Sequence, residues 1–171
     1  MERMQQIYRT KDPDVVFRFA REDDVPTLLR LIHGLAEYEK MEDDVTATEE
    51  TLRDSLFRRK SAEAVLAELR GEPVGYALFF HNFSTFLGRS GLYLEDIFVM
   101  RSCRGRGIGR ALLSFLARIA VERGCGRMEW ICLNWNTPSA DFYQAMGAKR
   151  QEEWTIFRLD GEELPKLARK F

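Results

Sequence analysis

A glycine-rich turn between an apolar strand and an amphipathic helix constrains this chain more than any other segment. The turn reads Arg104-Gly105-Arg106-Gly107-Ile108-Gly109, and it follows an apolar run over 91–100. Glycine lets the backbone approach a ligand closely, and the first turn of a helix leaves N–H groups unpaired, so this arrangement favours an anion, above all a phosphate. The helix that follows has one apolar face, made of Ile108, Leu112, Phe115, Leu116, Ile119 and Ala120.

The spacing of these glycines excludes two common phosphate sites. It matches neither the G-x-G-x-x-G pattern of dinucleotide-binding folds nor the G-x-x-x-x-G-K-[ST] pattern of P-loops, which disfavours nicotinamide cofactors and ATP. Arg101 and Arg110 lie beside the turn and add local positive charge. A solvated turn that binds nothing is the alternative interpretation.

The remaining hydrophobic pattern predicts a mixed α/β (α+β) protein with a largely antiparallel central sheet flanked by helices. We expect strands at 15–20, 62–70, 74–82, 91–100, 128–133 and 154–159. We expect helices at 25–36, shortly after Thr46, at 108–120 and at 137–147, while 162–168 fits a short helix that Pro165 weakens. With no repeat or linker visible, the chain is predicted to have an N-terminal extension, 1–14, and a single domain, 15–171.

Charge and cysteine content exclude several function classes. The chain has 26 Lys+Arg against 27 Asp+Glu, a net charge of −1, so no global basic field favours nucleic acid or an anionic membrane. Its three cysteines form no C-x-x-C pair, which disfavours zinc and structural disulfides. Residues 1–11 are polar, and the longest uncharged run, 73–88, is too short to span a bilayer. We expect a cytoplasmic protein with no metal, no nucleic-acid partner and no membrane partner.

Two carboxylates interrupt an otherwise apolar strand. Glu95 and Asp96 lie between Leu92-Tyr93-Leu94 and Ile97-Phe98-Val99. Neighbouring side chains of a strand point to opposite faces, so at least one carboxylate is expected in a partly buried environment. Burial there raises a carboxyl pKa, which makes such a group a candidate general base. We assign this role to Glu95 and leave Asp96 as catalytic or structural.

These segments resemble the GNAT acetyltransferase superfamily. The turn at 104–109 is similar to its pyrophosphate-binding motif, Arg/Gln-x-x-Gly-x-Gly/Ala. Three further blocks, 92–100, 135–143 and 35–39, resemble the spermidine/spermine (diamine) N-acetyltransferases, and the similarity extends from about Phe17 to Leu159. The resemblance implies a GNAT fold and an acetyl-CoA-dependent N-acetyltransferase that acts by direct transfer to a primary amine.

The resemblance also implies roles for individual residues. Glu95 would accept the amine proton, and Tyr143 would protonate the departing coenzyme A thiolate, although Tyr143 also fits a core position. Asn136 and Ser139 could equally be only the start of a helix. The residues expected at the cofactor are Ile97, Phe98, Val99, Arg104, Gly105, Arg106, Gly107, Ile108, Gly109, Arg110, Asn136 and Ser139.

The substrate is expected to be a small diamine, a polyamine or a thialysine/ornithine-like amine. Tyr38 and Glu39 match polyamine-contacting positions of the family, and Glu95 is expected there as well. The polyamine enzymes have an acidic residue followed by tryptophan before the catalytic strand, whereas this chain reads Ser84-Thr85-Phe86. That difference favours a thialysine- or ornithine-like amine. The resemblance further implies a homodimer.

Three alternatives remain at this level. The first is a non-catalytic acetyl-CoA-binding regulatory domain, since fold does not fix function. The second is a GNAT enzyme that acts on another amine or on a protein N-terminus. The third, a nucleic-acid-binding module that uses the arginine-rich turn, is disfavoured by the near-neutral charge.

Overall fold

The computed structural model describes residues 6–171 and forms two compact units, 6–131 and Cys132–Phe171, which are described separately. Part of the expected N-terminal extension, 1–5, lies outside the described residues. The division into an extension and a single domain therefore stays a prediction. Within 6–171, no helix is long and apolar enough to cross a membrane.

The first unit is built on a six-stranded sheet whose strands follow the order of the chain. All neighbouring strands are antiparallel except β5 and β6, which pair in parallel. This confirms the predicted mixed, largely antiparallel sheet and adds a short strand at the N-terminal end. The strands are β1 (Ile7–Arg9), β2 (Val15–Phe19), β3 (Glu63–Leu69), β4 (Glu72–Ser84), β5 (Arg89–Val99) and β6 (Met128–Glu129).

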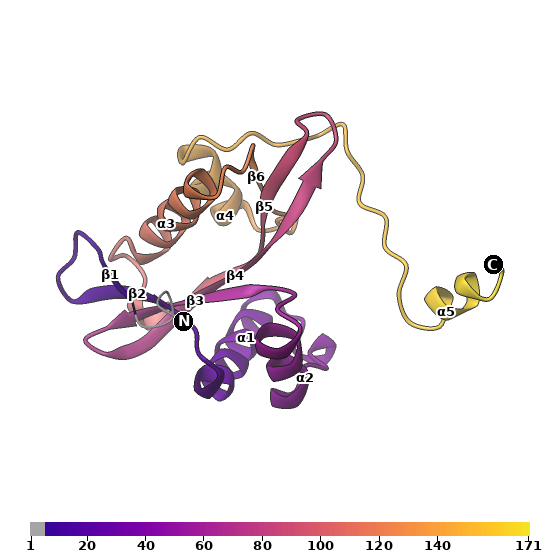
Figure 1. Ribbon diagram of the computed structural model, residues 1–171. Helices are drawn as coiled ribbons and strands as arrows, with labels where there is room; N and C mark the ends of the chain where they lie inside the picture. The colour runs from indigo at the N-terminus through magenta and orange to yellow at the C-terminus, as the bar shows by residue number, and fades with distance from the viewer. Residues whose placement is uncertain (1–5) are drawn as a thin grey trace. The chain divides into compact units, whose positions relative to one another are not determined.

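Helices cover both faces of this sheet. Helices α1 (Val25–Glu39) and α2 (Glu49–Arg53) lie on one side, and α3 (Ile108–Glu122) lies on the other (Figure 1). Four short turns complete the unit: η2 (Glu22–Asp24), η3 (Glu42–Asp44), a π-helical turn η4 (Asp54–Arg58) and η5 (Arg101–Cys103).

The alternation of side chains along the strands separates two apolar layers. On the α3 side, Phe17 and Phe19 of β2 contact Phe115, with ring centroids 5.7 and 6.5 Å apart. On the α1 side, buried side chains of the helices and the sheet form one cluster. Its members are Ala20, Leu28, Leu31, Leu56, Ala64, Leu66, Tyr76, Leu78 and Phe98.

Helix α1 approaches β5 unusually closely at Gly34. A Cβ atom at this position would lie 3.0 Å from Cε1 and 3.1 Å from Cζ of the Phe98 ring. A glycine in a helix interior costs roughly 1 kcal/mol relative to alanine, so its presence here is explained by the space that Phe98 occupies. The contact fixes the distance between the helix and the strand.

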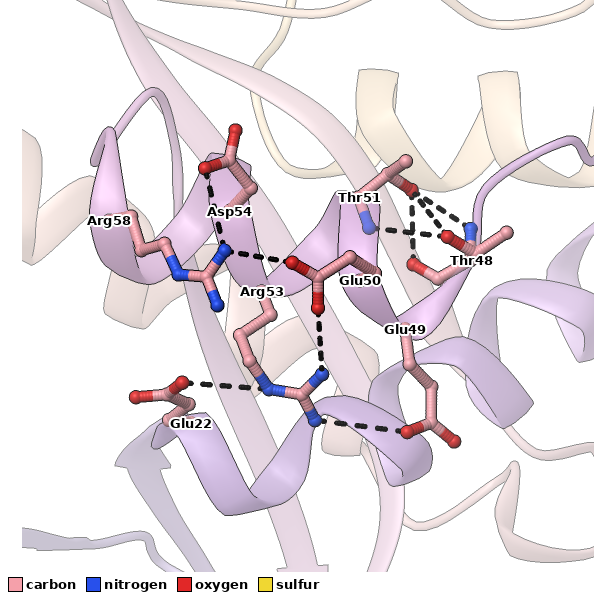
Figure 2. Close-up of polar contacts among 8 residues, drawn as sticks. All are labelled: Glu22, Thr48, Glu49, Glu50, Thr51, Arg53, Asp54 and Arg58. Atoms are coloured by element: carbon pink, nitrogen blue, oxygen red, sulfur yellow. Dashed lines mark hydrogen bonds and ion pairs between the residues drawn. The ribbon is translucent and has the colours of Figure 1, made fainter.

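Helix α2 begins two residues later than its sequence suggested. Thr48, not Thr46, is the N-cap: its hydroxyl accepts a hydrogen bond from the Thr51 backbone N–H at 3.2 Å. Figure 2 shows this cap together with a group of exposed ion pairs on the same helix. There, Arg53 lies 3.5 Å from Glu22 of η2 and thereby connects α2 to the start of α1.

In the second unit, α4 (Thr137–Ala145) and α5 (Glu163–Ala168) form where helices were expected. The strand predicted at 154–159 is wrong, because these residues adopt no regular structure. Trp154 and Phe157 are 76% and 92% exposed. The apolar residues gave the correct pattern for a strand, but a strand also needs a neighbouring edge for its backbone hydrogen bonds, and none of the described strands pairs with this segment. The strand expected at 128–133 is observed only as β6, because its pairing with β5 ends at Glu129.

A largely buried ion-pair cluster joins β2, β3 and the entrance to α1. Arg18 donates two hydrogen bonds to Asp24, at 2.6 and 2.8 Å, and one to Glu68 at 2.6 Å. Burial alone would raise the pKa of Asp24, but the hydrogen bond from Arg18 and the one from the Arg21 backbone outweigh it and lower that pKa. The cluster therefore depends on one cation that serves two carboxylates.

Replacing that cation should destabilise the fold strongly. Arg18→Met leaves two largely buried carboxylates without their partner, so the free energy of unfolding should fall by about 3 kcal/mol in urea denaturation. The matched control is Arg70→Met, which breaks an exposed pair with Asp14 and should cost less than about 1 kcal/mol. Equal losses in the two variants would contradict this account.

Candidate active site

A β-bulge places the two strand carboxylates differently. In the β4–β5 ladder, Leu78 pairs with Asp96 and Phe79 pairs with Leu94, so Glu95 is an extra residue without a partner on β4. The Glu95 side chain is exposed, whereas Asp96 is only partly exposed. A bulge inserts one residue, bends the strand and re-aims its side chains. Simple alternation along the strand predicted two opposite faces but did not reveal this irregularity.

Asp96 lies in the apolar layer beneath α1. The Tyr76 hydroxyl donates a hydrogen bond to Asp96 Oδ2 at 3.0 Å. Burial, followed by the negative charges of Glu95 and Glu39, raises the pKa of Asp96 to about 6, although the hydrogen bond from Tyr76 opposes this. Burial and the charge of Asp96 also raise the pKa of Tyr76, which keeps its hydroxyl protonated as a donor.

Glu39 completes a cluster of three carboxylates at the end of α1. Its charge, like that of Glu95, acts on both Asp96 and Tyr76, so the three acidic groups lie within electrostatic range of one another. Burial raises the pKa of the Glu39 carboxyl. Among the described residues, 6–171, no arginine or lysine forms an ion pair with any of these three carboxylates, so their mutual repulsion favours a cationic ligand.

The glycine-rich turn has the backbone geometry that its sequence suggested. Gly105 and Gly107 have φ values of +83° and +77°, and Gly107 is the N-cap of α3. The first helical hydrogen bond runs from the Ala111 N–H to the Gly107 carbonyl at 2.9 Å. The preceding N–H groups, those of Ile108, Gly109 and Arg110, therefore point out of the helix start with no acceptor within it.

The end of β5 lies next to this turn. Strand β5 pairs with β6 only at Leu92 and Tyr93, so the stretch Ile97, Phe98 and Val99 has a strand neighbour only on its β4 side among the described residues. The backbone edge on the other side is thus not used by a strand. One of its groups, the Val99 carbonyl, accepts a hydrogen bond from Arg104 Nε at 2.9 Å.

The arginines of the turn have different surroundings. Arg104 places its guanidinium carbon 4.6 Å from the centroid of the Tyr38 ring. Arg106 donates to Asp12 at 2.9 Å and lies 3.6 Å from Asp14, so part of its charge is compensated by the loop before β2. Arg110, on the first turn of α3, is exposed.

In the second unit, three predicted site residues belong to α4. The Asn136 side chain is buried and accepts a hydrogen bond from the Ser139 backbone N–H at 3.3 Å, which makes it the N-cap. Tyr143 lies about one helical turn after Ser139, and its ring contacts that of Phe142 at a centroid distance of 5.4 Å. The helix start therefore fits the capping interpretation, and a ligand role for these residues stays a prediction.

The β4–β5 hairpin carries the segment that differs from the polyamine enzymes. Ser84 is buried, and its hydroxyl accepts a hydrogen bond from the Leu87 N–H at 3.2 Å, so it stabilises the turn. Phe86 at the tip is 97% exposed. The segment that differs from the polyamine enzymes, Ser84-Thr85-Phe86, thus contains a structural serine and an exposed phenylalanine.

Comparison with known proteins identifies the fold and the family. Residues 20–148 match the family described as "Acetyltransferase (GNAT) family". The chain belongs to this family. Among solved structures, an integron cassette protein of V. cholerae superposes with a TM-score of 0.78 at 27% identity, covering 91% of this chain and 98% of that one.

Several similar proteins are named as N-acetyltransferases. A thialysine N-epsilon-acetyltransferase of Bos taurus is 40% identical over 168 residues, which cover 91% of this chain and 98% of that protein. An L-ornithine N5-acetyltransferase of Arabidopsis thaliana is 32% identical over 193 residues, covering 86% of this chain and 85% of that protein. This chain is accordingly an N-acetyltransferase.

The titration of Asp96 should be visible in the stability of the protein. The folded protein holds this proton up to about pH 6, whereas the unfolded chain releases it near the ordinary value of 3.8. The contribution of Asp96 to stability is therefore complete below pH 3.8 and is lost as the pH rises through about 6, a change of about 3 kcal/mol.

Asp96→Asn removes this titration while keeping an acceptor for the Tyr76 hydroxyl. The free energy of unfolding of the variant, relative to wild type, should rise between pH 4.5 and pH 7.5 in urea denaturation. Asp43→Asn, the same exchange at an exposed site in η3, serves as the control. A constant difference between Asp96→Asn and wild type over this range would contradict the assignment.

Proposed function

We propose that this protein transfers the acetyl group of acetyl-CoA directly to a primary amine of a small diamine, polyamine or thialysine/ornithine-like substrate. The observation that carries the proposal is the cluster of Glu39, Glu95 and Asp96, three carboxylates gathered at the β5 bulge. Folding alone disfavours such a cluster, and a substrate with one or more ammonium groups offsets its repulsion. The names of the relatives, one acting on thialysine and one on ornithine, support the same substrate class.

The turn before α3 fits the pyrophosphate of the acyl donor. A Cβ atom added at Gly105 or Gly107 would meet nothing within 4 Å, so there is open space beside the backbone of the turn. The N–H groups at the start of α3 and the positive end of its dipole are suited to an anion. The backbone edge at 97–99 offers hydrogen-bonding groups to the rest of the acetyl-CoA molecule. Acetyl-CoA supplies the activated acetyl thioester, and no metal is needed for this transfer.

Two residues would move protons in this reaction. A primary amine has a pKa of about 10 and is mostly protonated at neutral pH, so it must lose a proton before it can attack the thioester. Glu95, exposed on the bulge, is the proposed acceptor of that proton. Tyr143 of α4 is the proposed donor to the leaving thiolate.

The substrate's second charged group would bind near Glu39 and Tyr38 at the end of α1. Because this chain reads Ser84-Thr85-Phe86 where the polyamine enzymes have an acidic residue followed by tryptophan, we favour a compact thialysine- or ornithine-like amine over a long polyamine. The homodimer remains part of the proposal on family resemblance alone, and the cytoplasmic location on the polar composition of the chain.

The test is a panel of amines with Glu95→Gln as the diagnostic variant. Wild-type protein should release coenzyme A fastest with thialysine, ornithine or a diamine and slowest with a monoamine. Glu95→Gln should lower turnover by about 10²–10⁴ at pH 7, the usual effect of a lost general base, and recover partly toward pH 9.5, where more amine is already unprotonated.

The control for this experiment is Glu72→Gln, the same exchange at an exposed position at the start of β4. It should leave turnover and its pH profile unchanged. A wild-type protein that acetylates no amine in the panel would refute the proposed function. A deficit in Glu95→Gln that does not vary with pH would instead refute its role as the proton acceptor.

The donor site can be tested separately by a matched pair of glycine variants. Gly107→Ala and Gly71→Ala carry the same backbone penalty, since both glycines have positive φ, +77° and +85°, and neither has an atom within 4 Å of an added Cβ. Each should lose about 1–2 kcal/mol of stability.

Only Gly107→Ala should weaken binding of acetyl-CoA. The added methyl group occupies the space proposed for the phosphate and moves it out of hydrogen-bond distance of at least one N–H group; a lost charge-assisted hydrogen bond, about 1.5–3 kcal/mol, corresponds to at least about a tenfold change in the dissociation constant. Calorimetry measures this constant without turnover. Unchanged affinity of Gly107→Ala for acetyl-CoA would show that the turn is not part of the acetyl-CoA site.

A further inference from the structure

The side chain of Arg104 reaches from the glycine-rich turn to the end of α1. Its Nε donates to the Val99 carbonyl at 2.9 Å, which anchors the side chain at the end of β5. From there its guanidinium carbon lies 4.6 Å from the Tyr38 ring centroid and 5.8 Å from that of Phe98. One cation thus contacts two rings, one on the helix and one on the strand.

Arg104 is exposed, and the rings of Tyr38 and Phe98 are the side chains that contact its guanidinium. Among the residues that the structure describes, no carboxylate lies within ion-pair distance of Arg104, whereas Arg106 two positions later pairs with Asp12. A cation within about 6 Å of an aromatic centroid is attracted to the ring face, and an arginine guanidinium suits this geometry. The orientation of the Tyr38 ring is therefore coupled to the position of Arg104.

Tyr38 lies on the last turn of α1, directly before Glu39 of the carboxylate cluster. Lys40, which follows, has a left-handed conformation with φ of 60° and ends the helix. At a helix end, few backbone hydrogen bonds restrain the last side chains, so contacts of the side chains themselves have more influence on their position. The Arg104 contact supplies such a restraint from the opposite side of the site.

We propose that Arg104 is a positioning residue for the amine substrate: it holds the Tyr38 ring, and with it the end of α1, beside the carboxylate cluster. This inference rests on the proposed function. It assigns to Arg104 a role at the amine site that is separate from any contact with the pyrophosphate of the donor. The two roles can be told apart by changing Arg104: a role at the amine site alters the KM of the amine, whereas a contact with the pyrophosphate alters the dissociation constant of acetyl-CoA.

The experiment is a set of double-mutant cycles between Arg104→Gln and two variants of Tyr38. Tyr38→Phe keeps the ring and removes the hydroxyl, whereas Tyr38→Leu removes the ring face. Steady-state kinetics gives the KM of ornithine and the kcat for each protein, and calorimetry gives the dissociation constant of acetyl-CoA. Arg118→Gln, an exposed arginine of α3 paired with Glu122, is the control and should change none of these values.

Arg104→Gln should raise the KM of ornithine by about two- to fivefold in the wild-type and Tyr38→Phe proteins, the range expected for one exposed cation–π contact. In the Tyr38→Leu protein the same exchange should leave this KM unchanged, because the ring is already absent. Any effect on the dissociation constant of acetyl-CoA should be equal in all three backgrounds.

An equal rise of the ornithine KM in the Tyr38→Leu background would overturn the positioning role. So would a change confined to the dissociation constant of acetyl-CoA, which would leave Arg104 as a donor contact only. Absence of ornithine, thialysine and diamine turnover in the wild type would refute the proposed function itself, so the two failures are distinguishable. If Arg104→Gln does not fold, Arg104→Met, which also removes the cation, replaces it, and additivity with Tyr38→Leu has the same meaning.

Discussion

The packing of α1 against the centre of the sheet is the constraint on which the candidate site depends. Leu28 and Leu31 bury one face of the helix against a layer that includes Tyr76 and Phe98, and Gly34 allows the backbone to come close to the Phe98 ring. Burial of this layer supplies the driving force, and the glycine sets the spacing. Because both the helix and β5 are fixed by the same contact, the residues at their ends are brought to one place without any direct bond between Glu39 and Glu95.

The local charges follow from this arrangement and are hidden by the net charge of −1. Negative charge collects where α1 ends beside the β5 bulge, and positive charge collects at the turn before α3. Arg104 lies between the two regions and is held by aromatic rings and a carbonyl group. An ammonium substrate and an anionic donor therefore meet fields of opposite sign that lie close together in the fold, although a residue count shows a nearly neutral protein.

Sequence patterns predicted the elements that depend on local apolar spacing and missed those that depend on pairing. The helices at 25–39 and 108–122 and the central strands were found because their apolar faces repeat at the period of the element. The segment 154–159 has an apolar pattern that is equally typical of a strand, yet no described strand pairs with it. The residue types of Trp154 and Phe157 carry no information about whether a partner strand is present. The β1 strand was missed for the opposite reason, since three residues are too few to show a period. At the site, the turn and Glu95 were predictable from residue type, whereas the burial of Asp96 and the contact of Arg104 with Tyr38 arise only from tertiary packing.

The bulge at Glu95 has a consequence for how the chain tolerates change in length. A β-strand repeats every two residues, so one additional residue exchanges the inward and outward positions of everything that follows it. Up to Leu94 the strand is in one phase, and from Asp96 to Val99 it is in the other. Phe98 reaches the layer under α1 only in this second phase. Deleting Glu95 would remove the carboxylate and the bulge together but would leave Phe98 facing Gly34, because Leu94 and Asp96 already pair with neighbouring residues of β4, Phe79 and Leu78. The bulge thus takes up one extra residue while the second half of β5 stays in register with β4.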